Sequence, residues 1–552
     1  MRTLADALIA AASAERVRSI TLLGSDLQAR PLSYDEILAL ARRAAAALLD
    51  AGLRPGDRMF LVLPTGPEFL AAFFGGVLAG IVPCPLSPPQ GAQSPALFQE
   101  RLGELTRALG MRAVLAPPEI AGDAEGKLGD GVLTLTPDRL LEGPDAGLPD
   151  HLPAPEDVAF LQLTSGSTAL PKGVVVTHRA LLVNLRQIVL AAGIVPGDVM
   201  VSWLPLFHDM GLVAGVLLPL AYDMDLCLSS PFSFLRRPAH WLQAIHRYRG
   251  THSPAPVFAY RQLVDRVIDR DLAGLDLAGW RVAFIGAEPV HADVLERCER
   301  RLAPHGLGET TLVPCYGMAE ATLAITVKPL GERYRLRPVS RRALAREARV
   351  EAPSGAADEL VLVSSGRPVE GTRVAILDED GAALPDGHLG EITVRSPSLF
   401  SGYLGLAEPR PEEIAAGFQT GDLGFLEGGE LFITGRRKEL IILSGENHHP
   451  AEIEWAAAVD GVRATRIAAF GIEDPALGTE KLCVLAELDR HGDGLGTDGE
   501  TPAAAIRRRV REQTGLVVSH VQLVPAGTIP VTTSGKIRRA RARAIFLEMQ
   551  QG

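Results

Sequence analysis

The run from Leu163 to Gly173 concentrates hydroxyl groups, two glycines and one lysine within eleven residues. Glycines leave backbone amides uncovered, hydroxyls rotate to donate hydrogen bonds, and a lysine adds positive charge. A loop that wraps a triphosphate needs these groups. The run is not a Walker A motif, because Pro171 stands where that motif has the glycine before its lysine. Taken alone, a turn of this composition is as compatible with an ordinary loop as with a phosphate site.

Two segments further along the chain have side chains suited to the rest of a nucleotide. In the segment 316–320, the ring of Tyr316 could stack on a purine, and the carboxylate of Glu320 could hold a phosphate-bound magnesium ion. In the segment 418–423, Asp422 follows a strand and a turn, and it could accept hydrogen bonds from both ribose hydroxyls. The alternatives are a core tyrosine with a solvated glutamate, and an aspartate that caps a turn.

Three further groups could complete a site for chemistry at phosphorus. The segment 435–440 (GRRKEL) has basic residues of which one could reach the nucleotide and another could serve as a hinge, although such residues are also ordinary surface cations. Lys536 follows a glycine near the C-terminus, and a mobile domain could deliver it to neutralise charge on an attacked phosphate. His208 and Asp209 lie among apolar residues and could form either a core pair or the wall of an acid-binding pocket.

The composition is that of an ordinary globular protein, with 47% hydrophobic and 22% charged residues over 552 residues. This length predicts two to four domains. A formal net charge of −11 argues against a broad nucleic-acid-binding face. The five cysteines form no CxxC pair, so we expect buried thiols and a cytoplasmic protein.

Neither of the two apolar N-terminal stretches predicts a membrane span. The first 17 residues contain acidic residues and are typical of an amphipathic helix, not a signal peptide. Residues 69–86 include Gly75-Gly76 and end in Pro83-Cys84-Pro85, which favours a buried helix followed by a buried strand.

Helical periodicity alternates with short β-branched runs up to about residue 257, which predicts α/β layers with largely parallel sheets. We expect helices at 34–52, 68–79, 179–192, 211–221 and 238–248, and strands at 58–63, 81–86, 161–163, 174–178, 199–204, 225–230 and 251–257. Residues 120–155 are rich in Gly, Asp and Pro and predict an irregular connector.

The chain changes character twice after that. Residues 360–435 have short strands and tight turns, which predict a small antiparallel β unit. From residue 436 we expect a compact α+β domain, with strands at 439–445, 466–472 and 481–488, helices at 450–458 and 502–514, and a surface loop at 491–500. The predicted fold class is therefore α/β: a large N-terminal domain (1–435) of layered α/β subdomains plus the β unit, followed by a small, mobile α+β domain (436–552).

The candidate site segments described above, taken in their order along the chain, resemble those of the ANL superfamily of adenylate-forming enzymes. The resemblance extends from Leu32 to Lys536. The resemblance implies an N-terminal adenylation domain and a two-step use of ATP with Mg²⁺. A carboxylate attacks the α-phosphate and expels pyrophosphate, and the acyl adenylate then passes to a thiol or similar nucleophile. The small C-terminal domain acts as a lid that rotates between the steps.

The resemblance also assigns roles to individual residues. The phosphate loop comprises Thr164, Ser165, Gly166, Ser167, Thr168 and Lys172. Nucleotide-binding residues are Gly286, Ala287 and Glu288 at the adenine, Tyr316 stacked on the base with Gly317 and Met318 beside it, and Asp422 and Arg436 at the ribose. Lys438 is the hinge, Glu320 holds magnesium, and Lys536 is the lysine of the adenylation step; Thr164 and His208 are further candidate catalytic residues. Candidate acid-binding residues are His208, Asp209, Met210, Gly211, Phe258 and Tyr260.

Within the superfamily, the sequences of these motifs most resemble those of the fatty acyl-AMP ligases. The matching segments are WLPLFHDMGLVAGVLLPL, VFAYRQLV, RVAFIGAEPV, YGMAEATL and SSGRPVEG. Residues 329–359 occupy the place of that family's insertion, which is taken to block the rotation that allows coenzyme A to react. The resemblance therefore implies a fatty or related hydrophobic acid as substrate and the phosphopantetheine arm of an acyl carrier protein as acceptor.

Two other functions stay open at this point. An acyl-CoA ligase would use the same scaffold with a different acceptor, and residues 329–359 discriminate the two. A nucleotide-binding regulatory protein without catalysis is disfavoured because Lys172, Glu320, Asp422 and Lys536 are all present.

Two positions depart from the family pattern, and one basic cluster has two interpretations. Glu446 replaces a residue that is usually basic, and His252 to Pro256 replace a glycine-rich stretch at the entrance of the acyl pocket. Four arginines could attract an acidic carrier protein or could simply solvate a C-terminal helix: Arg538, Arg539, Arg541 and Arg543.

Overall fold

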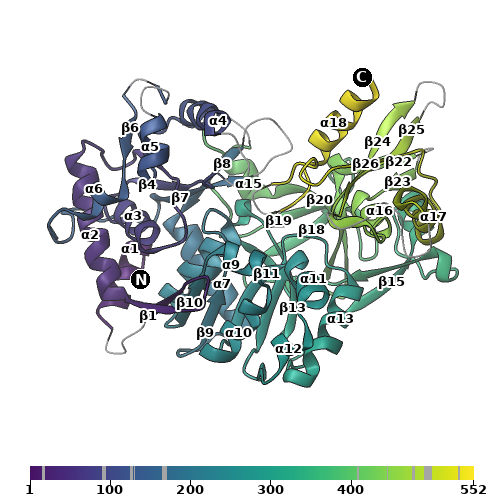
Figure 1. Ribbon diagram of the computed structural model, residues 1–552, viewed down its shortest axis with the longest axis horizontal. Helices are drawn as coiled ribbons and strands as arrows, with labels where there is room; N and C mark the ends of the chain where they lie inside the picture. Colours follow the sequence, from purple (N-terminus) through teal and green to yellow (C-terminus); the bar gives the residue numbers. More distant parts are fainter. Residues whose placement is uncertain are drawn as a thin grey trace.

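The structure is a computed structural model, and it describes residues 1–14, 19–89, 95–124, 128–129, 131–164, 171–406, 409–443, 446–474, 479–489, 500–532 and 535–551. Figure 1 shows a large assembly of α/β layers, with the C-terminal elements gathered at one end above the edge of the sheets. The division into a large N-terminal domain and a smaller C-terminal one agrees with the predicted fold class.

The largest sheet has nine strands in the order β17-β14-β13-β12-β11-β9-β10-β1-β2. The six strands β13, β12, β11, β9, β10 and β1 run parallel to one another. At one end the edge strand β2 pairs antiparallel with β1, and at the other end β14 pairs antiparallel with β13 and with the edge strand β17. Their bounds are Arg367–Pro368 (β17), Ala324–Val327 (β14), Leu312–Gly317 (β13), Val282–Gly286 (β12), His252–Pro256 (β11), Val199–Ser202 (β9), Asp225–Ser229 (β10), Ser19–Leu23 (β1) and Ala29–Ser33 (β2).

Helices cover both faces of this sheet, and successive residues of a strand enter different cores. Met200 of β9 belongs to one apolar cluster and Val201 to another, and Phe284 and Ile285 of β12 divide in the same way. This alternation is what a parallel sheet buried on both sides requires. The helices are α1 (Leu4–Ala12), α2 (Tyr34–Asp50), α7 (His178–Ala192), α8 (Leu218–Ala221), α9 (Pro231–Arg236), α10 (Ala239–Tyr248), α11 (Val257–Arg266), α12 (Asp269–Leu272) and α13 (Ala292–Leu302), with a short 3-10 turn η2 (Ala303–His305).

The helix expected at 211–221 is two elements. A π-helix, η1, spans Met210–Leu217 and is followed by α8. The amide of Leu218 bonds to the carbonyl of Val213, five residues back, and Pro219 has no amide hydrogen with which to continue the ladder.

A second, four-stranded parallel sheet has the order β4-β3-β5-β6. Its strands are Arg58–Leu61 (β3), Val82–Pro85 (β4), Ala113–Leu115 (β5) and Leu133–Leu135 (β6), with helices α3 (Pro67–Leu78), α4 (Pro95–Ala108), α5 (Pro118–Ala124) and α6 (Pro137–Leu141). The prediction of an irregular connector at 120–155 was therefore wrong for α5, β6 and α6, because these short elements gain their stability from the sheet they extend.

The apolar run at 69–86 forms α3 and β4, buried in protein as predicted. Gly75 lets α3 approach α2 closely, because a Cβ there would lie 2.5 Å from the Cβ of Ala44. Within the described part of the chain, no helix combines the length and apolar character needed to cross a membrane. Beside this sheet, β7 (Val158–Thr164) and β8 (Lys172–Thr177) form an antiparallel hairpin.

The β unit predicted at 360–435 is confirmed as an antiparallel sheet in the order β18-β19-β20-β21. Its elements are Arg373–Leu377 (β18), Gly390–Arg395 (β19), Phe418–Glu427 (β20) and Glu430–Arg436 (β21), with α15 at Pro411–Ala416. Residues 329–359 contain β15 (Leu336–Ser340), α14 (Arg341–Glu347) and η4 (Ala356–Asp358), and β15 pairs antiparallel with β16 (Glu359–Val363).

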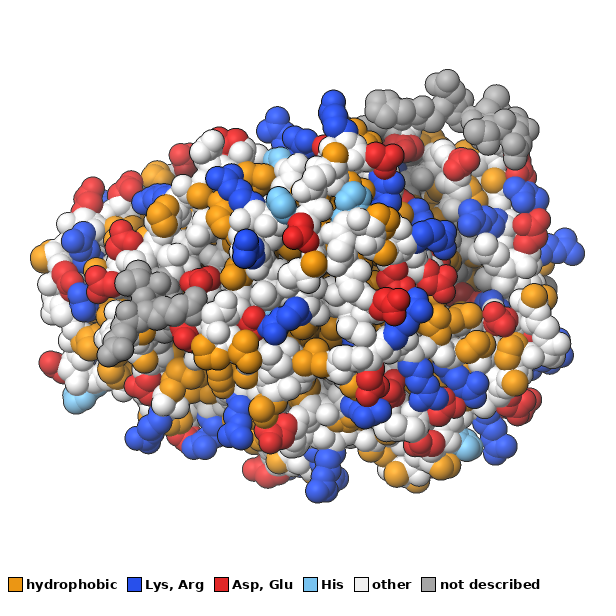
Figure 2. Space-filling model, turned by 90° about the horizontal axis from the view of Figure 1, so that it is seen from below, with side chains coloured by type: hydrophobic (Ala, Val, Ile, Leu, Met, Phe, Trp, Pro, Cys, Tyr) orange, Lys and Arg blue, Asp and Glu red, His pale blue; other side chains and the backbone are white. Residues whose placement is uncertain are grey.

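The C-terminal domain has the expected α+β composition around a three-stranded sheet, β24-β25-β26. Its elements are η5 (Arg437–Glu439), β22 (Ile441–Leu443), β23 (Glu446–His448), α16 (Pro450–Ala456), β24 (Val462–Asp474), β25 (Thr479–Leu488), α17 (Pro502–Thr514), β26 (His520–Val524) and α18 (Arg539–Gln551). Most of the loop expected at 491–500 lies outside the described residues. On the face in Figure 2, acidic and basic side chains are interspersed.

Candidate active site

The predicted site residues follow the carboxyl ends of neighbouring parallel strands. His208 follows β9, Phe258 follows β11, Glu288 follows β12, and Tyr316 lies at the end of β13. Carboxyl ends of parallel strands meet at one edge of a sheet, where the helix-connecting loops leave room for a ligand. The topology therefore brings together four segments that are far apart in the sequence.

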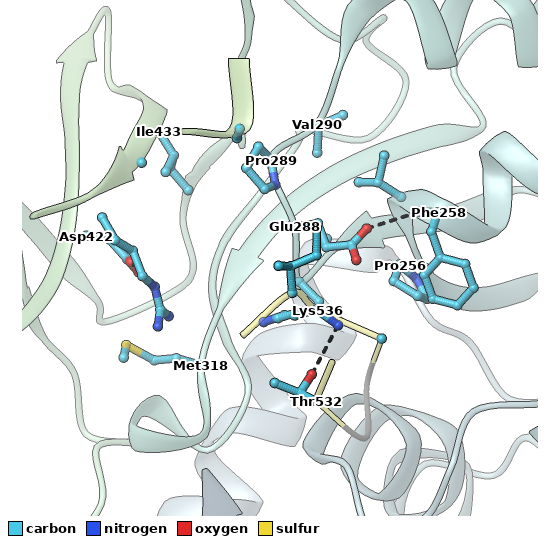
Figure 3. A pocket seen from close by; sticks show the side chains of 18 of the residues that line it. Pro256, Phe258, Glu288, Pro289, Val290, Met318, Asp422, Ile433, Thr532 and Lys536 are labelled. Atoms are coloured by element: carbon cyan, nitrogen blue, oxygen red, sulfur yellow. Dashed lines mark hydrogen bonds and ion pairs between the residues drawn. The ribbon is translucent and has the colours of Figure 1, made fainter. Parts of the chain in front are cut away.

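The β unit and the C-terminal domain form the opposite wall of one cavity of about 2190 Å³. This is larger than a site for one small molecule, roughly 300–1,000 Å³. Figure 3 shows Lys536 of the C-terminal domain beside Glu288, with Asp422 and Met318 across the cavity. The predicted residues that line it are Thr164, Lys172, His208, Asp209, Met210, Phe258, Gly286, Ala287, Glu288, Tyr316, Gly317, Met318, Glu320, Asp422, Arg436, Lys438 and Lys536.

Two predicted residues lie behind the cavity wall, and four lie outside the described residues. Tyr260 is fully buried in the core, where its hydroxyl donates to the carbonyl of Phe284 at 2.9 Å. Gly211 permits close packing, since a Cβ there would lie 2.2 Å from the carbonyl oxygen of Pro205. The structure thus gives both a role in packing. The predictions for Ser165, Gly166, Ser167 and Thr168 lie outside the described residues.

Asp422 connects the β unit to the end of the large sheet. The hydroxyl of Tyr316 donates to Asp422 Oδ2 at 2.6 Å, and Arg436 Nε lies 2.8 Å from Asp422 Oδ1. Burial and the adjacent Asp422 raise the pKa of Tyr316 well above its usual value, so the phenol stays a donor. Each carboxylate oxygen keeps a lone pair for a further donor, such as a ribose hydroxyl.

Glu320 is a buried carboxylate, 8% exposed. Burial raises its pKa, whereas a hydrogen bond from the hydroxyl of Tyr403, at 2.7 Å, lowers it. Sequence reasoning missed Tyr403, because nothing in the local pattern at 398–405 pointed to a partner eighty residues earlier in the chain.

His208 and Asp209 form a close pair at the start of the π-helix. His208 Nδ1 lies 2.5 Å from Asp209 Oδ1, and the Met210 amide donates to the same oxygen at 2.7 Å. Burial alone would raise the pKa of Asp209, but His208 and this amide lower it overall. Asp209 therefore remains an anion that fixes the imidazole of His208 at the cavity wall.

Lys536 is presented by a tight turn. Its amide donates to Thr532 Oγ1 at 3.1 Å, and Gly535 adopts φ +88°, which a residue with a side chain disfavours. Burial and the nearby Arg436 lower the pKa of Lys536, although Asp209 and Glu288 act in the opposite direction. Glu288 itself accepts the Phe258 amide at 3.1 Å. The ammonium group thus faces carboxylates from two different loops of the N-terminal domain.

Arg539 is a partly buried clamp, with its side chain 20% exposed, and neither interpretation of the C-terminal arginines anticipated it. It makes two hydrogen bonds of 2.7 Å to Glu454 in α16 and one of 2.5 Å to Glu439 in η5. These hydrogen bonds fix the turn that presents Lys536 relative to η5, the segment expected to be the hinge. Lys438 of that segment is exposed. The structure places only Arg541 in the solvated role, since it is exposed and pairs with Glu548.

The ordered segment at 329–359 contacts the C-terminal domain. Arg346 of α14 donates to Glu446 of β23 at 2.7 Å, and Arg341 of α14 pairs with Glu452 of α16. Glu446 therefore has a basic partner within residues 329–359.

The apolar part of the cavity lies beside β11. His252 and Ser253 are fully buried, and Ser253 accepts a hydrogen bond from Trp241 at 2.8 Å, so neither faces the ligand space. Pro254 and Pro256 do line the cavity, close to Phe258 and to Trp203, whose ring stacks on Phe234 with centroids 3.8 Å apart.

Comparison with known proteins identifies the family to which this chain belongs. The model of the AMP-binding enzyme family matches residues 11–404, more than half of the chain. The chain belongs to the AMP-binding enzyme family. It is an adenylate-forming ligase that uses ATP.

The relatives of this AMP-binding enzyme cover nearly its whole length. It is 35% identical to the medium-chain-fatty-acid–[acyl-carrier-protein] ligase JamA of Moorena producens, over 96% of this chain and 92% of that protein. It is 34% identical to the long-chain-fatty-acid–AMP ligase FadD26 of Mycobacterium marinum, over 95% and 93% of the two chains. A solved structure from a study of fatty acyl-adenylate ligases of E. coli and L. pneumophila superposes with a TM-score of 0.92, at 33% identity and over 100% and 99% of the chains.

The residues of this AMP-binding enzyme fit a magnesium ion that arrives with the nucleotide. In the described ranges, no three His, Cys, Asp or Glu side chains form a cluster that could hold a metal by themselves. Magnesium in nucleotide enzymes is bound by one or two carboxylates together with phosphate oxygens. A single buried carboxylate, Glu320, beside the expected phosphate site meets that requirement.

Proposed function

We propose that this enzyme activates a fatty or related hydrophobic carboxylic acid with ATP and transfers the acyl group to the phosphopantetheine thiol of an acyl carrier protein. The carboxylate oxygen attacks the α-phosphorus, a new O–P bond forms, and the bond to pyrophosphate breaks. The thiolate then attacks the acyl carbon and AMP leaves. The observation that carries the proposal is that Lys536, Glu320 and Asp422 line one cavity with an apolar extension.

The chain's own residues supply positioning and charge. Lys536 would neutralise the negative charge that develops at the α-phosphate, while Asp422 and Arg436 hold the ribose and Tyr316 stacks on the base. Thr164 and Lys172 would contact the β- and γ-phosphates. Magnesium held by Glu320 would screen the charge on the phosphate oxygens. His208, kept in place by Asp209, would orient the attacking carboxylate.

The apolar part of the cavity supports a hydrophobic acid. Phe258, Trp203 and the rings of Pro254 and Pro256 line the space next to His208. An alkyl chain buried there would gain about 0.8 kcal/mol per CH₂ group. JamA is named for medium-chain and FadD26 for long-chain fatty acids. The acyl chain length that this enzyme accepts is therefore measured in the product assay described below.

The contacts of the insertion support a carrier protein as acceptor. Arg346 and Arg341 join α14 to two elements of the C-terminal domain, and η4 packs near α17. These contacts favour the pose in which Lys536 is in the cavity and oppose the rotation that would admit coenzyme A. JamA, similar over nearly all of this chain, is named for an acyl-carrier-protein acceptor.

We also propose that the enzyme works in the reducing cytoplasm. All five cysteines are free thiols, and four of them are buried.

The test is mass spectrometry of the products formed from ATP, magnesium and mixed-length fatty acids, with coenzyme A and a holo acyl carrier protein present. The expected products are acyl adenylate and acylated carrier protein, without acyl-CoA, and their masses give the length of the acyl chain. Abundant acyl-CoA would contradict the proposed acceptor, and the absence of any adenylate would contradict the proposed reaction.

A further inference from the structure

The segment 400–404 connects two parts of the candidate site, and sequence analysis assigned it no role. Three backbone hydrogen bonds of 2.8–3.1 Å join residues 401–404 to residues 173–175 of β8. At the other end of the segment, the amide of Phe400 donates to the backbone carbonyl of Glu320 at 2.8 Å. The segment therefore bridges the hairpin that carries Lys172 and the turn that carries Glu320.

Tyr403 contacts both functional side chains at once. Its hydroxyl donates to Glu320 Oε1 at 2.7 Å, and Lys172 Nζ lies 4.4 Å from the centroid of its ring. The ring of Phe400 packs edge-on against it, with centroids 4.9 Å apart, and Phe400 is 3% exposed. The Tyr403 side chain thus holds an anion at its hydroxyl and a cation at its ring face, and a buried neighbour fixes its orientation.

We infer that Tyr403 is a positioning residue of the adenylation step. Its hydroxyl holds one oxygen of Glu320, and the other oxygen would bind the magnesium ion that accompanies the nucleotide. Its ring keeps the Lys172 ammonium in place at the start of β8, because the negative face of the ring attracts a cation. One side chain therefore sets the spacing between the two groups that grip the triphosphate. The inference rests on the proposed function.

The variant Tyr403→Phe separates the two contacts, because it removes the hydroxyl and keeps the ring. Hydrogen-bond partners of metal ligands typically change metal affinity or activity by about 10- to 100-fold. We expect the magnesium concentration for half-maximal adenylate formation to rise by that factor. In an equilibrium titration of ATP without fatty acid, magnesium should tighten binding less than in the wild type, while ATP binding without magnesium should be unchanged.

The variant Tyr403→Leu removes both contacts. It should show the same magnesium defect and should also weaken ATP binding without magnesium, by about two- to five-fold, because Lys172 loses its support. The matched control is Tyr334→Phe. The hydroxyl of Tyr334 donates to Glu299 at 3.1 Å, and neither residue lines the cavity. This control should leave both titrations unchanged.

The inference is overturned if Tyr403→Phe needs no more magnesium than the wild type, or if Tyr334→Phe shows an equal shift. It is also overturned if Tyr403→Phe weakens ATP binding equally with and without magnesium. A wild type that binds ATP but forms no adenylate from any fatty acid would contradict the proposed function instead. The binding titrations would still decide the role of Tyr403.

Discussion

The indole of Trp455 in the C-terminal domain stacks on the imidazole of His291 in the N-terminal domain, with ring centroids 4.2 Å apart and planes inclined by 13°. On the indole, the guanidinium of Arg261 lies 4.7 Å from the ring centroid. A single aromatic side chain from α16 is thus held by two groups from the opposite wall of the cavity. The contact joins the two domains in the arrangement that has Lys536 in the cavity.

Replacing Trp455 by leucine should loosen the lid. Aromatic pairs and cation–π contacts are each worth about 0.5–2 kcal/mol, so the loss should lower the adenylation rate about 5- to 50-fold with little change in the KM for ATP. Trp455→Phe keeps a stacking ring and should recover most of the rate. Steady-state pyrophosphate release measures both quantities. Equal rates for leucine and wild type would show that this stack does not hold the lid.

Lys536→Ala should reduce adenylate formation by a factor of about 10² or more, because one preorganised charge at the attacked phosphate is lost. ATP binding should persist, since the other groups that contact the nucleotide are intact. The exposed Lys438→Ala serves as the comparison, because it removes a cation at the expected hinge and not at the phosphate. A Lys536→Ala enzyme with normal turnover would remove this lysine from the mechanism.

Arg539→Gln should destabilise the C-terminal domain. Removing the guanidinium takes the shared cation from the largely buried Glu454 and the partly exposed Glu439, at a cost of about 1.5–3 kcal/mol. Arg541→Gln, two residues away, removes an exposed pair with Glu548 and should change the free energy of unfolding by less than about 1 kcal/mol. Thermal unfolding of both variants tests the difference. Similar losses in the two would contradict the clamp.

The Arg346–Glu446 pair predicts a charge-reversal experiment. Arg346→Glu places two carboxylates together and should free the C-terminal domain, so that some coenzyme A thioester forms. Glu446→Arg should act in the same direction. The double variant restores an attractive pair and should return to carrier-protein specificity. Thioesters measured by mass spectrometry decide, and additive gains of coenzyme A activity in the double variant would exclude the pair as a restraint.

His178 predicts acid sensitivity of the fold. Its Nδ1 accepts the Leu4 amide at 3.1 Å, and burial lowers its pKa from 6.5 to about 4. Because the unfolded chain takes up the proton first, this contribution to stability is present at neutral pH and is lost as pH falls from 6.5 towards 4.

Urea unfolding between about pH 7 and pH 4.5 measures this contribution of His178. His178→Asn keeps an acceptor without a titrating group, so its unfolding free energy should fall less steeply, by up to about 1.4 kcal/mol per pH unit. The exposed His151→Asn should retain the wild-type slope. Parallel curves for His178→Asn and wild type would contradict the prediction.

The sequence predicted the elements whose pattern is local. The alternation of helices and strands up to residue 257, the antiparallel β unit and the burial of residues 69–86 follow from periodicity and turn residues. The elements at 118–141 and the hairpin β15–β16 were missed, because short segments rich in Gly, Pro and Arg become ordered only through partners distant in the chain. The division at residue 435 remains a prediction.

The candidate site was predictable where a motif names a residue type and not where a contact joins distant segments. Glu320, Asp422 and Lys536 stand in recognisable motifs and line one cavity. Tyr403 and Trp455 carry no such signal, because their importance lies in partners about eighty and more than one hundred and sixty residues away. The arginines after Lys536 look alike in the sequence, yet Arg539 alone is clamped between two glutamates.

The backbone connects the N-terminal and C-terminal domains only once, between β21 and η5. The two walls of the cavity therefore belong to one molecule and are covalently joined at a single point. A short tether of this kind keeps the C-terminal domain near its partner surface at an effective concentration on the order of millimolar. Contacts such as that between Arg437 and Glu391, at 3.2 Å, are too weak to assemble separate polypeptides. If the C-terminal domain rotates as proposed, Lys536 would leave the cavity after one reaction and return for the next while staying tethered to the same molecule.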